Sequence, residues 1–186
     1  IGLLLFETKD SKSKGIQVVN WLVSLFVNVF RSIPYIILIV VLIPFTNTLV
    51  HTIVGPVAAL PSLILSAAPF FGRIVEMSFR EIDQGVLEAA EAMGASHWTI
   101  IFKVLLPESL PALVSGLTVT AISLVGYTAM AGAIGAGGLG ALAYNNGFLQ
   151  YNGTIILVAT ILIVLFVFVL QWIGDLLVKI IDKRVV

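Results

Sequence analysis

Residues 88–111 read EAAEAMGASHWTIIFKVLLPESLP, and they interrupt a chain that is otherwise built of apolar segments. The stretch holds three of the ten acidic residues and one of the two histidines. The whole chain is 59% hydrophobic and only 11% charged, with a mean hydropathy of +1.11. Since a soluble domain carries about 25% charged residues, this composition predicts an all-α, polytopic membrane helix bundle with a polar insert.

Composition and motifs also exclude several classes of function. The net charge is +0, which gives no electrostatic reason to expect a nucleic-acid partner. Without cysteine the chain can form neither disulfides nor a thiolate metal site, and we expect no metal site. No phosphate-binding loop and no catalytic constellation of side chains is present, so we expect no enzyme activity and no cofactor in this chain.

Hydrophobic segments long enough to cross a membrane surround the insert. A spanning helix needs about 20 mostly apolar residues. We expect the end of a first span at 1–6, spans at 33–50, 54–75, 112–133 and 154–178, and an insert outside the membrane at 76–111. Because the chain begins within an apolar run, most of the first span is expected to be missing, which gives five spans in the full chain.

The segment 16–31 is predicted to be a separate helix with one polar stripe. The stripe consists of Gln17, Asn20, Ser24, Asn28 and Arg31, at steps of three and four residues. Pro34 is expected to end this helix, because proline removes a donor and disfavours the helical conformation in the residue before it. The helix either lies at the membrane interface with its polar edge toward water or packs within the bundle.

The basic residues predict the orientation. The loops at 47–53 and 134–153 contain no lysine or arginine, whereas Lys9, Lys12, Lys14, Arg31, Arg73, Arg80, Lys103, Lys179, Lys183 and Arg184 are all assigned to the other side. The positive-inside rule therefore places the 7–14 loop, the insert and the C-terminus in the cytoplasm.

No acidic residue is expected near the middle of a span. A proton-coupled carrier normally needs a titratable group there, so this class is disfavoured, while a sodium-coupled carrier stays open. The glycine-rich residues 132–140, GAIGAGGLG, follow no strand and do not indicate a dinucleotide site. They predict close helix packing or a tight re-entry of the backbone at the outer side.

The insert itself is predicted to form two helices joined by a turn. Helix-forming residues fill 86–93, Gly94 provides the left-handed cap, and Ser96 can cap a second helix over 97–106 that ends at Pro107. Trp98, Ile101, Phe102 and Leu105 form the apolar face of this second helix. Such a hairpin either packs on its own membrane helices or docks into a groove of a cytoplasmic partner.

The spacing within this stretch resembles the EAA loop of ABC importer permeases. The pattern is Glu-Ala-Ala, three residues, Gly, nine residues, an aliphatic residue, one residue and Leu-Pro. It is met by Glu88, Ala89, Ala90, Gly94, Val104, Leu106 and Pro107, with valine where isoleucine is usual. Elsewhere, NVFRSIPYIILIVVLIPFT, APFFGRIVE and GYTAMAGAIGAGGLG resemble the methionine-importer permeases within that family, over essentially the whole chain.

This resemblance implies a type I ABC importer permease fold in a prokaryotic inner membrane. The expected assembly has two copies of this chain, two cytoplasmic ATPase subunits that bind ATP and Mg, and an external binding protein or lipoprotein that delivers D- and L-methionine. The first helix of the insert would couple ATP-driven movements of the ATPase to the permease. Cytoplasmic-side support is expected from Arg31, Pro34, Arg73 and Glu76, and a substrate path from Ser123, Tyr127 and Met130.

Three alternatives stay open. The chain is the permease of another ABC importer, for osmoprotectants or another small solute; or a sodium-coupled carrier, in which the insert has no role; or a membrane scaffold whose insert recruits a cytoplasmic protein without transport. Loss of ATPase association after changes at Glu88 or Gly94 would separate the importer from the carrier.

Overall fold

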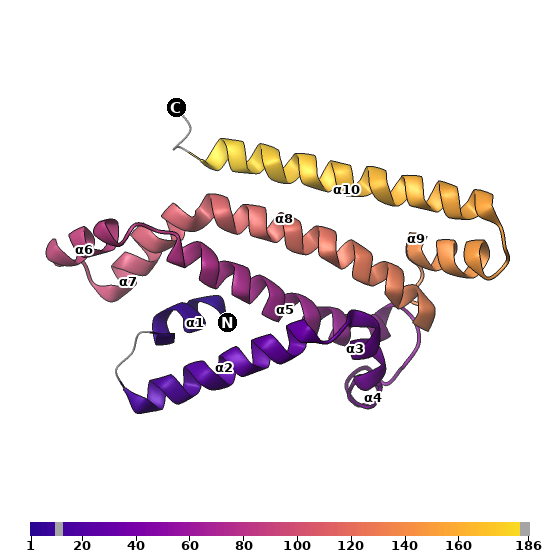
Figure 1. Cartoon of the computed structure of the whole chain (residues 1–186), viewed down its shortest axis with the longest axis horizontal. Coiled ribbons are helices and arrows are strands. Elements are labelled where there is room, and N and C mark those ends of the chain that lie inside the picture. Colours follow the sequence, from indigo (N-terminus) through magenta and orange to yellow (C-terminus); the bar gives the residue numbers. More distant parts are fainter. Residues whose placement is uncertain (10–12, 183–186) are drawn as a thin grey trace.

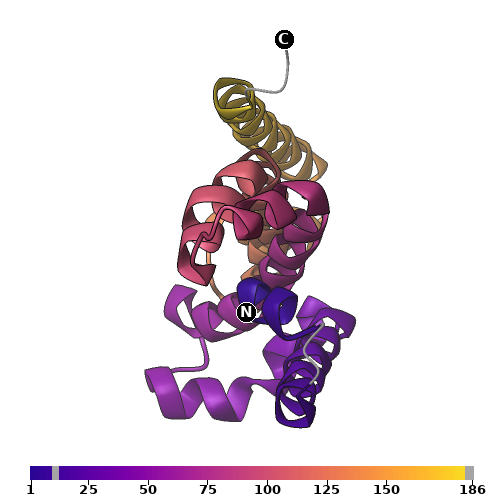
Figure 2. The same cartoon turned by 90° about the vertical axis from the view of Figure 1, so that its left-hand side faces the viewer.

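The computed structural model describes residues 1–9 and 13–182, and within these ranges every regular element is a helix. The helices α2, α5, α8 and α10 lie side by side, with α10 at one edge of the bundle and α2 at the opposite edge (Figures 1 and 2). The short helices α6 and α7 project at one end, toward which the C-terminal end of α10 also points, and α9 lies at the other end (Figure 1). Lys12, Lys183 and Arg184, which the orientation argument uses, lie outside the described residues.

The bounds of the elements, in chain order, are as follows. The first half contains α1 (Gly2–Lys9), α2 (Lys14–Ser32), α3 (Tyr35–Val41), α4 (Ile43–Val50), α5 (Pro56–Arg80) and α6 (Gln84–Ala92). The second half contains α7 (His97–Ile100), the π-helix η1 (Ile101–Leu105), α8 (Leu106–Ala131), the 3₁₀-helix η2 (Gly132–Ile134), α9 (Gly138–Ala141), the π-helix η3 (Leu142–Phe148) and α10 (Gly153–Ile181).

Three helices in the described part of the chain are long and apolar enough to cross a membrane, namely Pro56–Arg80, His97–Ile134 and Gly153–Ile181. The pair formed by α2 and α3 makes a fourth if it counts as one broken span, and its two helices are bent by 108°. The bend lies at Ile33 and Pro34, where the backbone is extended. The break that Pro34 predicts is therefore present.

The prediction of one helix over 33–50 is wrong. This segment is divided into α3, of 7 residues, and α4, of 8 residues, which meet at Leu42. At 1.5 Å per residue each is about 11 to 12 Å long, against about 30 Å of hydrocarbon. Pro44 lies in the first turn of α4, where it is compatible with a new helix but not with continuation of the old one.

The predicted end of the second insert helix at Pro107 is also wrong, because α7, η1 and α8 form one continuous helix. In η1 the backbone hydrogen bonds join residues five positions apart; for example, the Leu106 N–H donates to the Ile101 carbonyl. Pro107 lies in the first turn of α8, directly after this π segment. Its missing N–H therefore falls where the hydrogen-bonding pattern changes from π to α, and the helix continues past the proline.

Small residues allow the long helices to approach closely. A Cβ on Gly116 of α8 would overlap Ile74 of α5, and a Cβ on Gly174 of α10 would overlap the Thr118 side chain of α8. At the far end from the insert, Gly132 lies against the backbone of Ala141, and Gly140 lies against Ala129. The chain thus folds back on itself within 132–141, as the glycine-rich stretch predicts.

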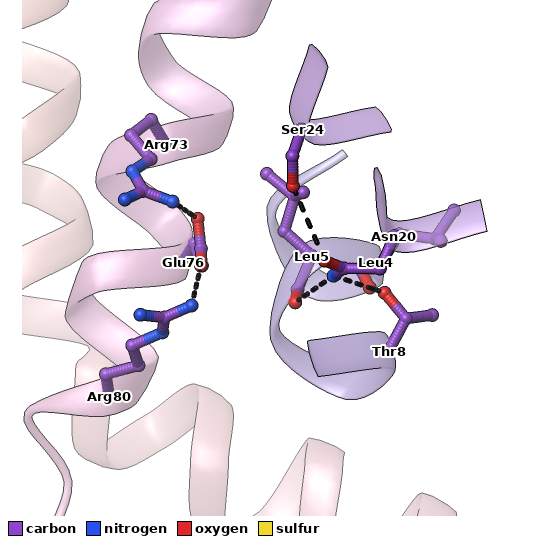
Figure 3. Close-up of polar contacts among 8 residues, drawn as sticks. All are labelled: Leu4, Leu5, Thr8, Asn20, Ser24, Arg73, Glu76 and Arg80. Atoms are coloured by element: carbon purple, nitrogen blue, oxygen red, sulfur yellow. Dashed lines mark hydrogen bonds and ion pairs between the residues drawn. The ribbon is translucent and has the colours of Figure 1, made fainter. Parts of the chain in front are cut away.

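The polar stripe of α2 packs within the bundle only in part, because Asn20 and Ser24 are half-buried while Gln17, Asn28 and Arg31 are exposed. The Asn20 side-chain amide donates to the Leu5 carbonyl at 3.2 Å and to Thr8 Oγ1 at 2.8 Å, so it joins α2 to α1 (Figure 3). Ser24 Oγ lies 3.5 Å from Asn20 Oδ1. Of the two alternatives for this helix, packing within the bundle is the one observed for Asn20.

Candidate functional site

The insert between α5 and α8 is a compact helical hairpin. Asp83 caps α6 by accepting a hydrogen bond from the Gly85 N–H at 2.8 Å, and Ser96 Oγ accepts from the Thr99 N–H at 3.3 Å at the start of α7. Gly94 has φ of +77°, in the left-handed region that favours glycine. The predicted roles of Gly94 and Ser96 in this turn are confirmed by these bonds and angles.

The residues of the EAA pattern do not all face the same way. Ala90 is buried, Val104 is half-buried, and Glu88, Ala89, Gly94, Leu106 and Pro107 are exposed. Glu88 and Glu91 form an exposed acidic edge along α6. This edge, together with Ala89, is therefore the part of α6 that is free to contact another protein.

The apolar face predicted for 97–106 is divided in two. Ile101 and Leu105 are 5% and 2% exposed, and Leu105 forms a cluster with Phe79 and Ile82 at the end of α5. Trp98 and Phe102, by contrast, are 65% and 60% exposed and stack on each other at 6.0 Å between ring centroids. One half of the face holds the insert onto α5, and the other half is an exposed aromatic pair.

A contact that the sequence does not indicate joins the first helix to the insert. His97 Nε2 lies 3.1 Å from a carboxylate oxygen of Glu7, at the C-terminal part of α1. The two residues are 90 positions apart in the sequence, and no periodicity or motif relates them. This contact and the apolar neighbours Phe6 and Leu87 line a small hollow between α1 and the insert.

A buried carboxylate lies on α5 just before the insert. Glu76 is 2% exposed and forms ion pairs with both Arg73 and Arg80, which lie three residues before and four residues after it on the same helix (Figure 3). Arg73 and Glu76 are predicted site residues that the structure brings together. Arg80 was not among them, although its spacing of four from Glu76 is the signal that predicts the pair.

Arg31 and Pro34, which are also predicted to support the cytoplasmic side, do not join this cluster. The Arg31 guanidinium lies over the ring of Phe70, 5.9 Å from its centroid. Phe70 precedes the end of α5 at Arg80 by ten residues, or about 15 Å of helix. Both residues lie where α2 meets α3, and their support of the cytoplasmic side stays a prediction.

The three residues proposed for the substrate path share one face of α8 but have different surroundings. Ser123 Oγ donates to the Val119 carbonyl at 2.9 Å, within its own helix. Tyr127 stacks on Tyr35 at 4.7 Å and borders the core cluster of α3, α5 and α8. Met130 faces an open hollow of about 420 Å³, which it lines with Ile36 and Tyr144.

No group of three or more potential metal ligands exists among the described residues. The geometry at the insert, with an exposed acidic helix and an exposed aromatic pair at the end of a membrane bundle, is suited to binding a protein surface.

Comparison with known proteins finds relatives that match nearly the whole chain. The chain is 56% identical over 181 residues to the methionine import system permease protein MetP of Bacillus subtilis (strain 168), covering 97% of this chain and 82% of the relative. It is 44% identical over 184 residues to the probable D-methionine transport system permease protein MetI of Pasteurella multocida (strain Pm70), covering 99% and 85%.

Solved structures agree with these relatives. A chain of the MetNI methionine ABC transporter in an inward-facing conformation superposes with a TM-score of 0.92 and 46% identity, covering 98% of this chain and 84% of that one. A chain of an amino acid ABC transporter shares the fold alone, with a TM-score of 0.69 and 21% identity over 99% and 83% of the two chains. The fold is that of a type I ABC importer permease, in a multi-pass membrane protein.

The family model described as "binding-protein-dependent transport system inner membrane component" matches residues 16–186. This match includes the insert and all the long helices. The chain therefore belongs to the family of binding-protein-dependent transport system inner membrane components.

Proposed function

We propose that this chain is the permease subunit of an ATP-driven ABC importer for methionine, in its D- and L-forms. The observation that carries the proposal is the α6–α7 hairpin, which matches the EAA pattern and presents an exposed acidic edge beyond the end of the membrane helices. Methionine as the substrate is supported by relatives that are 40–56% identical and are named as methionine permeases.

The working assembly contains two copies of this chain, two ATPase subunits and an external binding protein. ATP and Mg bind to the ATPase subunits, and hydrolysis takes place there. The large exposed apolar surface of α10, in which only Ala159 and Gly174 are buried, is consistent with contact to lipid and to the second copy. The insert and the C-terminus face the cytoplasm, and α9 and η3 face the binding protein.

Coupling follows from the position of the hairpin. α6 seats in a groove of the ATPase, with Glu88 and Ala89 at its surface. The turn at Gly94 holds α6 against α7, and α7 is continuous with α8. Movement of the ATPase subunits is thereby transmitted to a helix that crosses the membrane, and alternating access results.

Uptake of labelled methionine tests the proposal. Cells that make the full-length permease with its ATPase and binding protein are compared with cells carrying Glu88→Lys or the charge reversal Glu81→Lys, at an exposed position just outside α6. We expect Glu88→Lys to abolish uptake at normal membrane levels, Glu81→Lys to retain it, and D-methionine rather than glycine betaine to compete.

The other outcomes separate the alternatives. Competition by glycine betaine alone would keep the ABC mechanism and reject methionine. Uptake that is indifferent to Glu88 and to ATP depletion but follows the sodium gradient would favour the carrier. Binding of a cytoplasmic protein with no uptake of any solute would favour the scaffold.

A further inference from the structure

Arg31 lies about halfway along the membrane helix that it contacts. Its guanidinium carbon is 5.9 Å from the centre of the Phe70 ring. Phe70 lies 14 residues after the start of α5 at Pro56 and ten residues before its end at Arg80. These separations correspond to about 21 Å and about 15 Å of helix, so Arg31 contacts α5 well inside the length of that helix.

The side chain points toward the bundle. Residues 20, 24, 27 and 31 follow one another at steps of four, three and four, so they share one face of α2. On this face Asn20 binds α1 through two hydrogen bonds, and Val27 is only 1% exposed. Arg31 therefore extends from the face that packs inward, although its own side chain is exposed in the single chain.

Among the described residues no carboxylate lies within ion-pair distance of Arg31, in contrast to Arg73 and Arg80. Both of these are paired with Glu76, and no ion pair is formed by Arg31. A charged group at this depth is costly unless it serves a pathway or meets an opposite charge. The missing opposite charge is therefore expected to come from outside this chain.

The chemistry around Arg31 suits a carboxylate. The guanidinium carbon lies over the Phe70 ring, and the group carries five N–H donors in one plane. In-plane donors bind a carboxylate through two parallel hydrogen bonds. The exposed Asn28 side chain, three residues earlier on α2, adds an amide close to the same place.

We propose that Arg31 binds the carboxylate of the transported amino acid partway across the membrane. The proposal rests on the proposed function, and it names the chemical class that the path accepts, a small solute with a free carboxylate. Arg31 is then a binding residue of the transport path, and Phe70 orients it.

The test uses the permease–ATPase complex in lipid nanodiscs and in proteoliposomes with the binding protein. The variants are Arg31→Gln, which removes the charge, Arg31→Lys, which keeps it without the planar donors, and Lys14→Gln, a matched loss of charge at the exposed other end of α2. Two quantities are measured: ATP-driven uptake of L-methionine, and equilibrium binding of L-methionine and of L-methioninamide to the nanodisc complex without the binding protein.

We expect Arg31→Gln to weaken uptake at low substrate concentration about tenfold or more, because a charge-assisted hydrogen bond is lost. Arg31→Lys should be intermediate and Lys14→Gln unchanged. Wild type should bind L-methionine better than L-methioninamide, which lacks the carboxylate, and Arg31→Gln should lose that preference. This ratio does not depend on how much of a variant folds.

Equal uptake by wild type and Arg31→Gln would overturn the inference and leave the proposed function intact. So would a loss of uptake in Arg31→Gln with an unchanged preference for L-methionine over the amide, since Arg31 would then have only a structural role. If wild type itself shows no ATP-driven uptake, the proposed function fails, which is a separate result.

Discussion

Gly94 is needed for the conformation of its backbone and not for close packing. Its φ is +77°, and no heavy atom lies within 4 Å of the position that a Cβ would take. A side chain there meets open space but must adopt a left-handed conformation, which costs an L-residue about 1–2 kcal/mol. We expect Gly94→Ala to lower ATP-driven uptake severalfold at normal membrane levels, and Gly94→Asn, whose residue tolerates this conformation better, to lower it less.

The control for Gly94 is the same substitution at Gly153, the first residue of α10. That position is also free of neighbours within 4 Å but does not have a positive φ, so Gly153→Ala should keep full uptake. If Gly94→Ala and Gly153→Ala behave alike, the turn of the insert does not depend on glycine.

Glu76 is a buried charge, and its removal should lower the free energy of unfolding. Its carboxylate is 2% exposed and holds Arg73 and Arg80, whose side chains are 37% and 35% exposed. Breaking a buried pair costs about 3–5 kcal/mol, but solvent at the two arginines reduces this, so we expect Glu76→Gln to destabilise the protein by roughly 1–3 kcal/mol. Thermal unfolding of the purified permease in detergent measures the change.

The neighbouring carboxylate provides the comparison for Glu76. Glu81→Gln makes the same chemical change at an exposed residue five positions later, and it should leave the unfolding temperature within error of wild type. Equal unfolding temperatures for the two variants would show that the cluster on α5 contributes nothing to stability.

At the scale of elements, the sequence predicts those helix ends and turns that depend on neighbouring residues. Pro34, Gly94 and Ser96 act on the residues directly beside them, and the structure confirms all three. Pro107 failed as a stop signal because the π-helix before it shifts the hydrogen bonds, and a π-helix has no reliable pattern in sequence. The segment 33–50 failed because hydropathy measures its apolar length but not the turn at Leu42.

The contact between α8 and α10 depends on Gly174. A Cβ at this position would overlap Oγ1, Cγ2 and Cβ of Thr118, a side chain that branches at Cβ and has little freedom to move. Overpacking of this kind typically costs about 1–3 kcal/mol, so Gly174→Ala should lower the unfolding temperature. Gly15→Ala, on α2, is the matched control because only Ser13 Oγ lies as near as 4.0 Å; an equal effect of both changes would refute the close contact.

The molecule as a whole has two distinct ends, one with the insert and the end of α10, the other with α9 and η3 (Figure 1). Because the chain has no cysteine, each end can be marked by a single introduced thiol. Met93, at the end of α6, is 80% exposed, and Tyr151, before α10, is 95% exposed. We expect a membrane-impermeant maleimide to label Tyr151→Cys in right-side-out vesicles and Met93→Cys only in inside-out ones.

Labelling of both cysteines from the same side would contradict the orientation that the positive-inside rule predicts. Labelling of each from the opposite side would reverse it. In either case the proposed contact between α6 and a cytoplasmic ATPase would fall.

Contacts between residues far apart in the chain could not be predicted from the sequence. The hairpin of the insert was predictable because its caps and turn are local, whereas the contact between Glu7 and His97 requires α1 to lie beside the insert. The prediction for Arg31 rests on the positive-inside rule, which applies to residues near membrane ends. The contact of Arg31 with Phe70 depends on how α2 packs against α5, which the sequence alone does not show.

The unbroken helix from His97 to Ile134 makes the two ends of the molecule parts of one lever. Its 38 residues correspond to about 57 Å of helix, measured along the helix axis. A displacement of α7 can therefore reach the region of Met130 through the backbone of one helix. The widened turn of η1 is the place where this helix can yield first, so the stiffness of residues 101–105 sets how much of the displacement reaches the far side.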